Sequence, residues 1–223
     1  MNEGFNISDC ALIAIATGEK AQNLREFRDH LRTVHPGCFY YHFWGGLLYP
    51  HFNDPEFQND FAVWASRNLH DQKISEQFAV IDPNIYSDIE DLRQEIIEIV
   101  EERLYESEHV PWAKRGQEFH FIRSQIVIFE TGITYTDPRE LVEAIPNMSL
   151  GSIFFHFIDS RRRTEGHRND ISVWLEGLGD EYEELIKVLD KIDPYFTTLS
   201  ELRNIIHIAF NNFFKKIPNG KLT

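Results

Sequence analysis

The sequence predicts a mainly helical fold made of two copies of one unit, related by a pseudo-twofold axis and packed through a shared hydrophobic face as one globular body. Three observations support this prediction: an internal repeat, helix-start signals at matching places in both copies, and apolar residues at helical spacing near the end of each copy. Short extended segments open both copies, so an α+β fold with a small sheet is the alternative.

The internal repeat appears when the second half is laid on the first half. The gapless matches are Thr17-Gly18 with Thr131-Gly132, Arg25-Glu26 with Arg139-Glu140, Gly37 with Gly151, and His42-Phe43 with His156-Phe157. After a few lost residues the match resumes, with Asn59-Asp60, Trp64, Ile81-Asp82-Pro83 and Leu92-Arg93 facing Asn169-Asp170, Trp174, Ile192-Asp193-Pro194 and Leu202-Arg203. We therefore predict a tandem duplication, with a first repeat over residues 5–105, a linker over 106–117 and a second repeat over 118–217.

Each copy is expected to begin with a short strand or buried extended arm. Residues 11–16 are apolar, residues 119–129 are rich in Ile, Val and Phe, and each segment leads into a Thr-Gly pair. A first helix follows in both copies, because Asn23 with Glu26, and Asp137 with Glu140, place a capping oxygen three residues before an acidic side chain.

Four more helices are expected in each copy. The aromatic runs over 39–48 and 153–162 follow Gly37 and Gly151, glycines that interrupt the preceding secondary structure. These runs predict a second helix that is buried on several sides. Aspartates are expected to start the next two helices, Asp60 and Asp170 as caps of the third, and Asp71 and Asp180 at the fourth. Capping boxes then predict a fifth helix, at Ser87 with Glu90 and at Thr198 with Glu201.

Composition and charge limit the classes of function. Of 223 residues, 42% are hydrophobic and 13% aromatic, which is enough for a packed core. A count of 22 Lys and Arg against 36 Asp and Glu gives a formal net charge of −14, which repels a phosphate backbone, so nucleic acid is not expected as a partner. We expect no membrane partner and a cytoplasmic location, because the chain has no apolar run of membrane-spanning length and no signal-peptide pattern.

Four spaced segments resemble a known family. They are Tyr41 to Leu48 (YHFWGGLL), Asn59 to Ala65 (NDFAVWA), Phe119 to Ser124 (FHFIRS) and Ser152 to Ile158 (SIFFHFI). Together they resemble DUF5752, a prokaryotic family of unknown function, and the resemblance extends over nearly the whole chain. The family has no assigned activity, cofactor or catalytic residues, so the resemblance implies no particular chemistry.

Two histidines at the same place in both copies are the first candidates for a site. His42 and His156 lie among aromatic residues, and a partly desolvated imidazole suits a metal ligand, a proton shuttle or a general base near Asp60 or Asp170. The alternative is structural, with each histidine tying its helix to a backbone group of the extended segment. Duplication would preserve either role.

Metal and cofactor sites are not expected. There is no His-Glu-x-x-His motif, and no two histidines are four residues apart. His70-Asp71 resembles the dipeptide of helical metal-dependent phosphohydrolases, but the second copy keeps only Asp180, and capping explains that aspartate. Cys10 and Cys38 stand where the second copy has serines, so we interpret them as small fillers in a reducing compartment.

The two copies differ most just after the aromatic run. The first copy is apolar there and the second is basic; the candidate ligand-binding residues are Trp44, Tyr49, Arg161, Arg162, Arg163 and Arg168. Guanidinium groups bind phosphate or carboxylate through paired hydrogen bonds, and a facing aromatic stretch would hold a sugar or base ring. The alternative is that the arginines pair with the protein's own carboxylates, such as Asp159 and Glu165.

These features favour a non-enzymatic binding or regulatory module that recognises a protein partner or a small anionic metabolite through the two divergent stretches. The common nucleotide-binding and acyl-transfer motifs are absent from the sequence. The alternative is an enzyme acting on a phosphorylated or glycosylated small molecule, with His42 or His156 as general base, Asp60 or Asp170 nearby, and the arginines holding the anion. The oligomeric state stays open.

Overall fold

The computed structural model describes residues 4–48, 57–86, 88–106, 109–195 and 197–216. The chain forms two compact units. One covers residues 12–126, and we call it the contiguous unit; the other combines residues 1–11 with 127–223, and we call it the composite unit. These units do not share the bounds of the predicted repeats, because each joins the helices of one repeat to part of the extended arm of the other.

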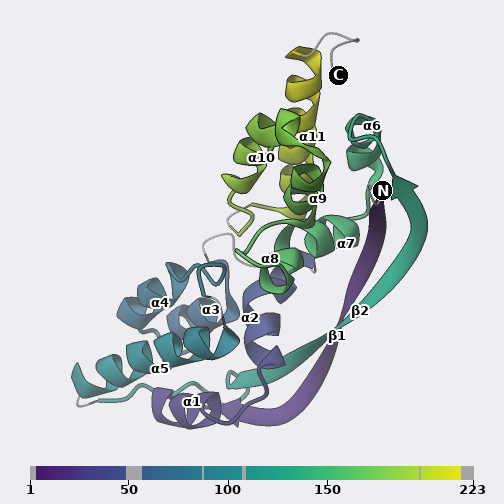
Figure 1. Cartoon of the computed structure of the whole chain (residues 1–223). Coiled ribbons are helices and arrows are strands. Elements are labelled where there is room, and N and C mark those ends of the chain that lie inside the picture. The colour runs from purple at the N-terminus through teal and green to yellow at the C-terminus, as the bar shows by residue number, and fades with distance from the viewer. Residues whose placement is uncertain (1–3, 49–56, 87, 107–108, 196, 217–223) are drawn as a thin grey trace. The chain divides into compact units, whose positions relative to one another are not determined.

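Two long strands form a two-stranded antiparallel sheet, drawn in purple and teal in Figure 1. β1 spans Phe5–Ala21 and β2 spans Phe119–Tyr135. Both are longer than the sequence predicts and continue past their Thr-Gly pairs. Gly18 and Gly132 have positive φ values of 85° and 73°, a conformation that allows a bulge within a continuing strand. The fold is therefore mostly helical with a small sheet, as the α+β alternative describes.

The contiguous unit has an aromatic core shared by its helices and the first residues of β2. Its helices are α1 (Leu24–Leu31), α2 (Gly37–Leu48), α3 (Asp60–Arg67), α4 (Gln72–Ala79) and α5 (Ile89–Glu106). Phe27 on α1 has ring-centroid distances of 5.5, 6.2 and 5.1 Å to Phe61, Phe78 and Phe119. Such ring pairs contribute about 0.5–1.5 kcal/mol each beyond the area they bury, so they hold the start of β2 on α1 and α3.

The composite unit has shorter and less uniform helices. They are α6 (Glu140–Ala144), α7 (Leu150–Ile153), α8 (Ser160–Arg163), α9 (Asp170–Leu178), α10 (Glu183–Asp190) and α11 (Leu199–Lys216), with 3-10 turns η1 (Ile145–Asn147) and η3 (Asp180–Tyr182). The predicted helix over 153–162 is helical throughout, but its middle part, η2 (Phe154–Asp159), is a π-helix between α7 and α8. All six residues of η2 are buried.

Local signals predict several helix starts correctly. The Asn23 side chain accepts hydrogen bonds from two amides in the first turn of α1, and Asp71 accepts one from the first turn of α4. Thr198 and Glu201 exchange hydrogen bonds as a capping box before α11. The predicted cap Ser87 lies outside the described residues.

The caps of α3 and α9 differ from the prediction. Their capping side chains are Asn59 and Asn169, which accept hydrogen bonds from backbone amides three residues further on, at 2.9 and 2.8 Å. Asp60 and Asp170 are the first residues of these helices, where the helix dipole favours a carboxylate. Asp180 begins the 3-10 turn η3, just before α10. Since an asparagine caps each helix, both first-turn carboxylates are available for other contacts.

Each strand begins on helices that are distant from it in sequence. Phe5, at the start of β1, packs on His156 and Trp174 in the composite unit, with ring-centroid distances of 4.9 and 5.2 Å. Phe119, at the start of β2, packs on His42 in the contiguous unit at 4.7 Å. The first residues of each strand are therefore part of the core of the unit in which that strand begins.

No single helix in the described ranges has both the length and the apolar composition needed to cross a membrane. Two helical segments, Glu140–Asn147 and Leu150–Arg163, reach that length and apolar composition when they are taken together, but the angle between them is 118°.

The two buried thiols are expected to make stability fall at high pH. Burial raises the pKa of Cys10, assisted by Asp159 and Asp9, from 9.0 to about 12, and burial raises the pKa of Cys38 to about 11. A thiol with a raised pKa in the folded state stabilises the protein fully below pH 9, and this contribution is lost as the pH rises through 11 to 12. Urea unfolding between pH 7 and pH 11 is the measurement.

The control is the double variant Cys10→Ser, Cys38→Ser, because serine does not titrate in this range. Serine is a conservative choice here, since the hydroxyl of Ser124 donates to the carbonyl of Gly37 much as the Cys10 thiol donates to that of Gly151. The wild-type protein should lose more stability than the variant above pH 9. Equal losses would show that the thiols do not contribute.

Candidate functional site

His42 on α2 is buried and uses both ring nitrogens. Its Nδ1 lies 2.7 Å from Oδ2 of Asp60, and its Nε2 accepts a hydrogen bond from the backbone N–H of Ile122 at 3.1 Å. A backbone amide is always the donor, so a neutral ring carries its proton on Nδ1 and donates it to Asp60. His42 thereby joins α2 and α3 to β2 within the contiguous unit.

His156 makes the corresponding contacts in the composite unit. Its Nδ1 lies 2.9 Å from Oδ2 of Asp170, and its Nε2 accepts a hydrogen bond from the backbone N–H of Ser8 at 2.9 Å. His156 lies in η2, Asp170 begins α9, and Ser8 belongs to β1. The structure therefore brings together both predicted histidine–aspartate pairs, one in each unit.

These contacts favour a structural role for both histidines over a catalytic one. A general base needs a nitrogen lone pair that faces the substrate. In both rings the Nε2 lone pair accepts from a backbone amide and the Nδ1 faces a carboxylate. The geometry therefore supports the alternative in which each histidine ties a strand to its helices.

Arg163 reinforces the pair in the composite unit. Its Nε donates to Oδ2 of Asp159 at 2.8 Å, its Nη2 donates to Oδ2 of Asp170 at 3.0 Å, and its guanidinium carbon lies 4.0 Å from the centre of the Phe155 ring. Burial lowers the pKa of Arg163, but Asp170 and Asp159 outweigh burial and raise it. Arg163 therefore contributes to the internal contacts that hold Asp170 beside His156.

The other arginines of the basic stretch also contact the protein itself. Arg161 donates to a backbone carbonyl at 3.0 Å, Arg162 lies 4.0 Å from Asp159, and Arg168 donates to Glu176 at 2.7 Å. Asp159 is one of the carboxylates expected as an internal partner. The contacts of the stretch thus fit internal pairing better than an empty anion clamp.

The candidate ligand-binding residue Trp44, in the apolar stretch of the first predicted repeat, is buried. Trp44 is 2% exposed, stacks on Tyr40 at 5.2 Å, and donates from Nε1 to Oδ1 of Asn84 at 3.4 Å. Such a side chain belongs to the core and does not present a surface for a ligand. Tyr49 lies outside the described residues, so its role stays a prediction.

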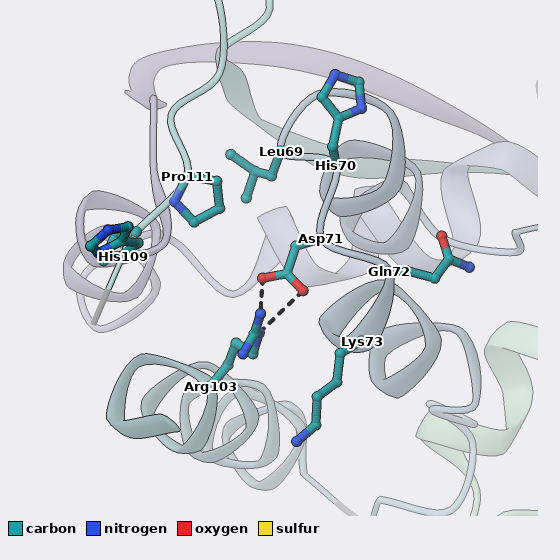
Figure 2. Close-up of a pocket in the computed structure, with 9 residues that line it drawn as sticks. Leu69, His70, Asp71, Gln72, Lys73, Arg103, His109 and Pro111 are labelled. Atoms are coloured by element: carbon teal, nitrogen blue, oxygen red, sulfur yellow. Dashed lines mark hydrogen bonds and ion pairs between the residues drawn. The ribbon is translucent and has the colours of Figure 1, made fainter. Parts of the chain in front are cut away.

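A pocket of about 450 Å³ lies at the turn between α3 and α4 in the contiguous unit (Figure 2). It is lined by residues 69–73, by Arg103 on α5 and by residues 109–111. Arg103 donates from Nε to both carboxylate oxygens of Asp71, at 3.1 and 2.8 Å. Asp71 is 6% exposed, so this ion pair forms a nearly buried part of the pocket wall.

Lys73 brings a second cation to this pocket. Its Nζ hydrogen-bonds both carboxylate oxygens of Glu106, the last residue of α5, at 2.5 and 2.6 Å. Asp71, two residues before Lys73, combines the predicted capping role with the ion pair to Arg103. No group of three or more His, Cys, Asp or Glu side chains suited to a metal ion occurs in the described part of the chain.

The backbone at the pocket rim is constrained. His70 has a φ of 55°, in the left-handed region that favours glycine, and the next amide, of Asp71, donates to the carbonyl of Ala65 at 3.0 Å. A non-glycine residue in this region carries strain, which occurs more often than average at functional sites. Figure 2 shows the His70 ring directed away from the Asp71 carboxylate, so these two side chains do not converge as ligands of one ion.

A second pocket, in the composite unit, has the opposite charge. Its volume is about 400 Å³, and it lies beside the strands, α6 and α7. Asp9, Glu140 and Glu143 line it, and its lining includes no Lys or Arg. Of these two pockets, only the one at the α3–α4 turn has cations that favour an anion.

Comparison of the whole sequence places this chain in a family. Residues 2–211 match DUF5752, a family of unknown function. The chain belongs to the DUF5752 family. This confirms the resemblance carried by the four aromatic segments, and the family brings no assigned activity to this member.

A solved structure has the same fold as this DUF5752 protein. It is OrfY from Thermoproteus tenax, with a TM-score of 0.81, 24% sequence identity, and coverage of 96% of this chain and 98% of that chain. At this level of identity the likeness shows the fold alone. No curated protein matches the sequence.

Sequence reasoning missed the two cations of the α3–α4 pocket in this DUF5752 protein. Lys73 and Arg103 lie on different helices and far apart in sequence, and each alone is an ordinary surface residue type. The one usable signal is Asp71, whose capping position is predicted correctly. The ion pair that Asp71 makes with α5 depends on tertiary packing and has no local pattern.

Proposed function

We propose that this DUF5752 protein is a non-enzymatic binding module that recognises a small anionic ligand at the α3–α4 pocket. The observation that carries the proposal is that the side chains of Lys73 and Arg103 both line this pocket at the start of α4. The chain as a whole carries a net charge of −14, so most of its surface repels anions. In such a protein, a pocket with two cationic side chains is the best place to bind an anion.

The start of α4 adds to the attraction. The first amides of a helix point outward with a partial positive charge and bind anions. Asp71 accepts from the amide of Ile74 at 3.4 Å, a long contact that satisfies one donor of the first turn. An oxyanion beside Lys73 would lie close to the remaining positive end of this helix.

The non-enzymatic part of the proposal rests on the histidines. In both His42 and His156 the two ring nitrogens are engaged, one with a carboxylate and one with a strand amide. The protein-partner alternative relies on the two divergent stretches, in which Trp44 is buried and Arg163 pairs with two aspartates. Small-anion recognition at the pocket therefore has the better support.

We also propose that the chain arose by internal duplication and works in the cytoplasm. Support for duplication comes from contacts that recur at matching positions in both units. Phe119 and Ile122 meet His42 as Phe5 and Ser8 meet His156. The cytoplasmic location is supported by the two free, buried thiols.

Substitution of Lys73 by Gln is expected to weaken the binding of inorganic phosphate. The loss should be about 5- to 10-fold, or about 1–1.4 kcal/mol, because one charge-assisted hydrogen bond is removed. The measurement is an NMR titration of the full chain at constant ionic strength, following the amides of the first turn of α4.

Lys187→Gln provides a matched control. Lys187 is also exposed, 54% against 52% for Lys73, and it also pairs with a glutamate, Glu183, at 2.7 Å. It lies on α10 in the composite unit and is not one of the residues that line the α3–α4 pocket. Equal weakening by both substitutions would mean that phosphate responds to overall charge, and the proposed site would be wrong.

A further inference from the structure

We infer that Glu106 is a built-in competitor that occupies the anion position of the α3–α4 pocket, and that the ligand is an oxyanion of the phosphate or phosphate-monoester class. This inference rests on the proposed function and identifies both the ligand class and a control of the same site.

The carboxylate of Glu106 lies between the two cations that line the pocket. Its two oxygens are 2.5 and 2.6 Å from Nζ of Lys73, and Oε2 is 3.7 Å from Nη1 of Arg103. The Glu106 carboxylate, an anion with two oxygens, is therefore already bound at the point that Lys73 and Arg103 both reach. The carboxylate stands in for the ligand.

Two features make Glu106 a weak occupant. It is the last residue of α5, where the negative end of the helix dipole disfavours a carboxylate. Its side chain is 34% exposed and that of Lys73 is 52% exposed, and exposed ion pairs of this kind are weak. A free anion with more charge and more acceptor oxygens can therefore displace it.

Arg103 determines the class of ligand that gains most from the displacement. Its Nε is held by Asp71 at 2.8 Å, which orients the guanidinium and leaves the terminal nitrogens as the donors nearest to Glu106. A tetrahedral oxyanion presents more acceptors than a carboxylate, so it can accept from Lys73 and the guanidinium together. This geometry favours phosphate over a monocarboxylate such as acetate.

The test compares Glu106→Gln with Glu102→Gln in the full chain, using inorganic phosphate as the probe in the NMR titration. Both substitutions remove one negative charge from α5. Glu106 contacts Lys73 and Arg103, two residues that line the pocket, whereas Glu102 is exposed on the same helix. Glu106→Gln is expected to bind phosphate about 5- to 10-fold more tightly than wild type, because the competing charge is gone. Glu102→Gln should bind about as wild type, and acetate should bind every variant more weakly than phosphate.

The outcomes separate this inference from the proposed function. If wild type binds phosphate and Lys73→Gln weakens it, but Glu106→Gln binds like wild type or like Glu102→Gln, the competitor role is overturned and the anion site stands. If no variant binds phosphate at the pocket amides, both are overturned. Thermal unfolding of each variant checks that the fold is retained, and tight binding by a folded Glu106→Gln variant supports the inference.

Discussion

A chain that lacks residues 1–11 is expected to lose the structure of the composite unit and to keep that of the contiguous unit. Residues 5–11 supply the buried side chains of Phe5 and Ile7 and the Ser8 amide that hydrogen-bonds His156. Burial of the two apolar side chains contributes about 3–6 kcal/mol together. Since a whole domain is stable by about 5–15 kcal/mol, this loss is enough to unfold the composite unit.

Amide hydrogen exchange measured by mass spectrometry will show which unit is affected. Peptides from α9 to α11 should lose protection, and those from α1 to α5 should keep it. The control is the fragment 12–126, which contains both strand segments of the contiguous unit and all five of its helices. We expect it to fold alone. Loss of protection in both units, or in neither, would contradict the division of the chain.

Substitution of His42 or His156 by Ala is expected to destabilise the unit in which each lies by about 2–4 kcal/mol. Each change leaves a strand amide without its acceptor, removes a donor from an aspartate, and opens a cavity beside a buried phenylalanine, Phe119 or Phe5. Urea unfolding is the measurement. Phosphate binding at the α3–α4 pocket should survive His156→Ala, since that histidine belongs to the other unit.

His120→Ala is the matched control, because His120 lies between Phe119 and Phe121 on β2 but is exposed. The free energy of unfolding of this variant should differ from that of the wild type by about 0.5 kcal/mol or less. Glutamine at position 42 should cost less than alanine, since its side chain keeps an acceptor for the Ile122 amide. A small effect of both alanine substitutions would argue against the structural role and reopen a catalytic one.

The sequence predicts those helices best that begin with a local signal. Asn23, Asp71 and Thr198 cap helices as expected, because a cap depends on side-chain and backbone groups only a few residues apart. The caps of α3 and α9 are misplaced by one residue, since Asn59 and Asp60 both have oxygens suited to capping. Only the geometry of the preceding turn decides between them.

The strand lengths were not predictable from hydrophobic pattern. The apolar segments stop near Thr17 and Thr131, but pairing between β1 and β2 carries both strands beyond these residues. The threonine hydroxyls support this pairing, as Thr17 donates to the carbonyl of Phe121 and Thr131 to that of Ile7, each at 2.5 Å. Strand extension is thus a property of the pair and not of either segment alone.

The candidate site residues also fall into those that the sequence predicts and those that only the tertiary structure reveals. Repetition in the sequence singles out His42 and His156 and the aspartates that the structure places beside them. It does not reveal that each Nε2 is engaged by a strand from the other predicted repeat, a contact that weakens the case for catalysis. Nor does it pair Lys73 with Glu106, because neither residue has a distinctive local pattern.

The sequence by itself determined the helical content, the recurrence of one pattern in both halves, several helix starts and the acidic character of the chain. These properties arise from composition and from interactions within one or two helical turns. The tertiary structure alone decided which helices each strand packs on, which histidine nitrogens are occupied, and where Lys73, Arg103 and Glu106 meet. Those features depend on contacts between residues far apart in sequence, and no local pattern of side chains encodes such contacts.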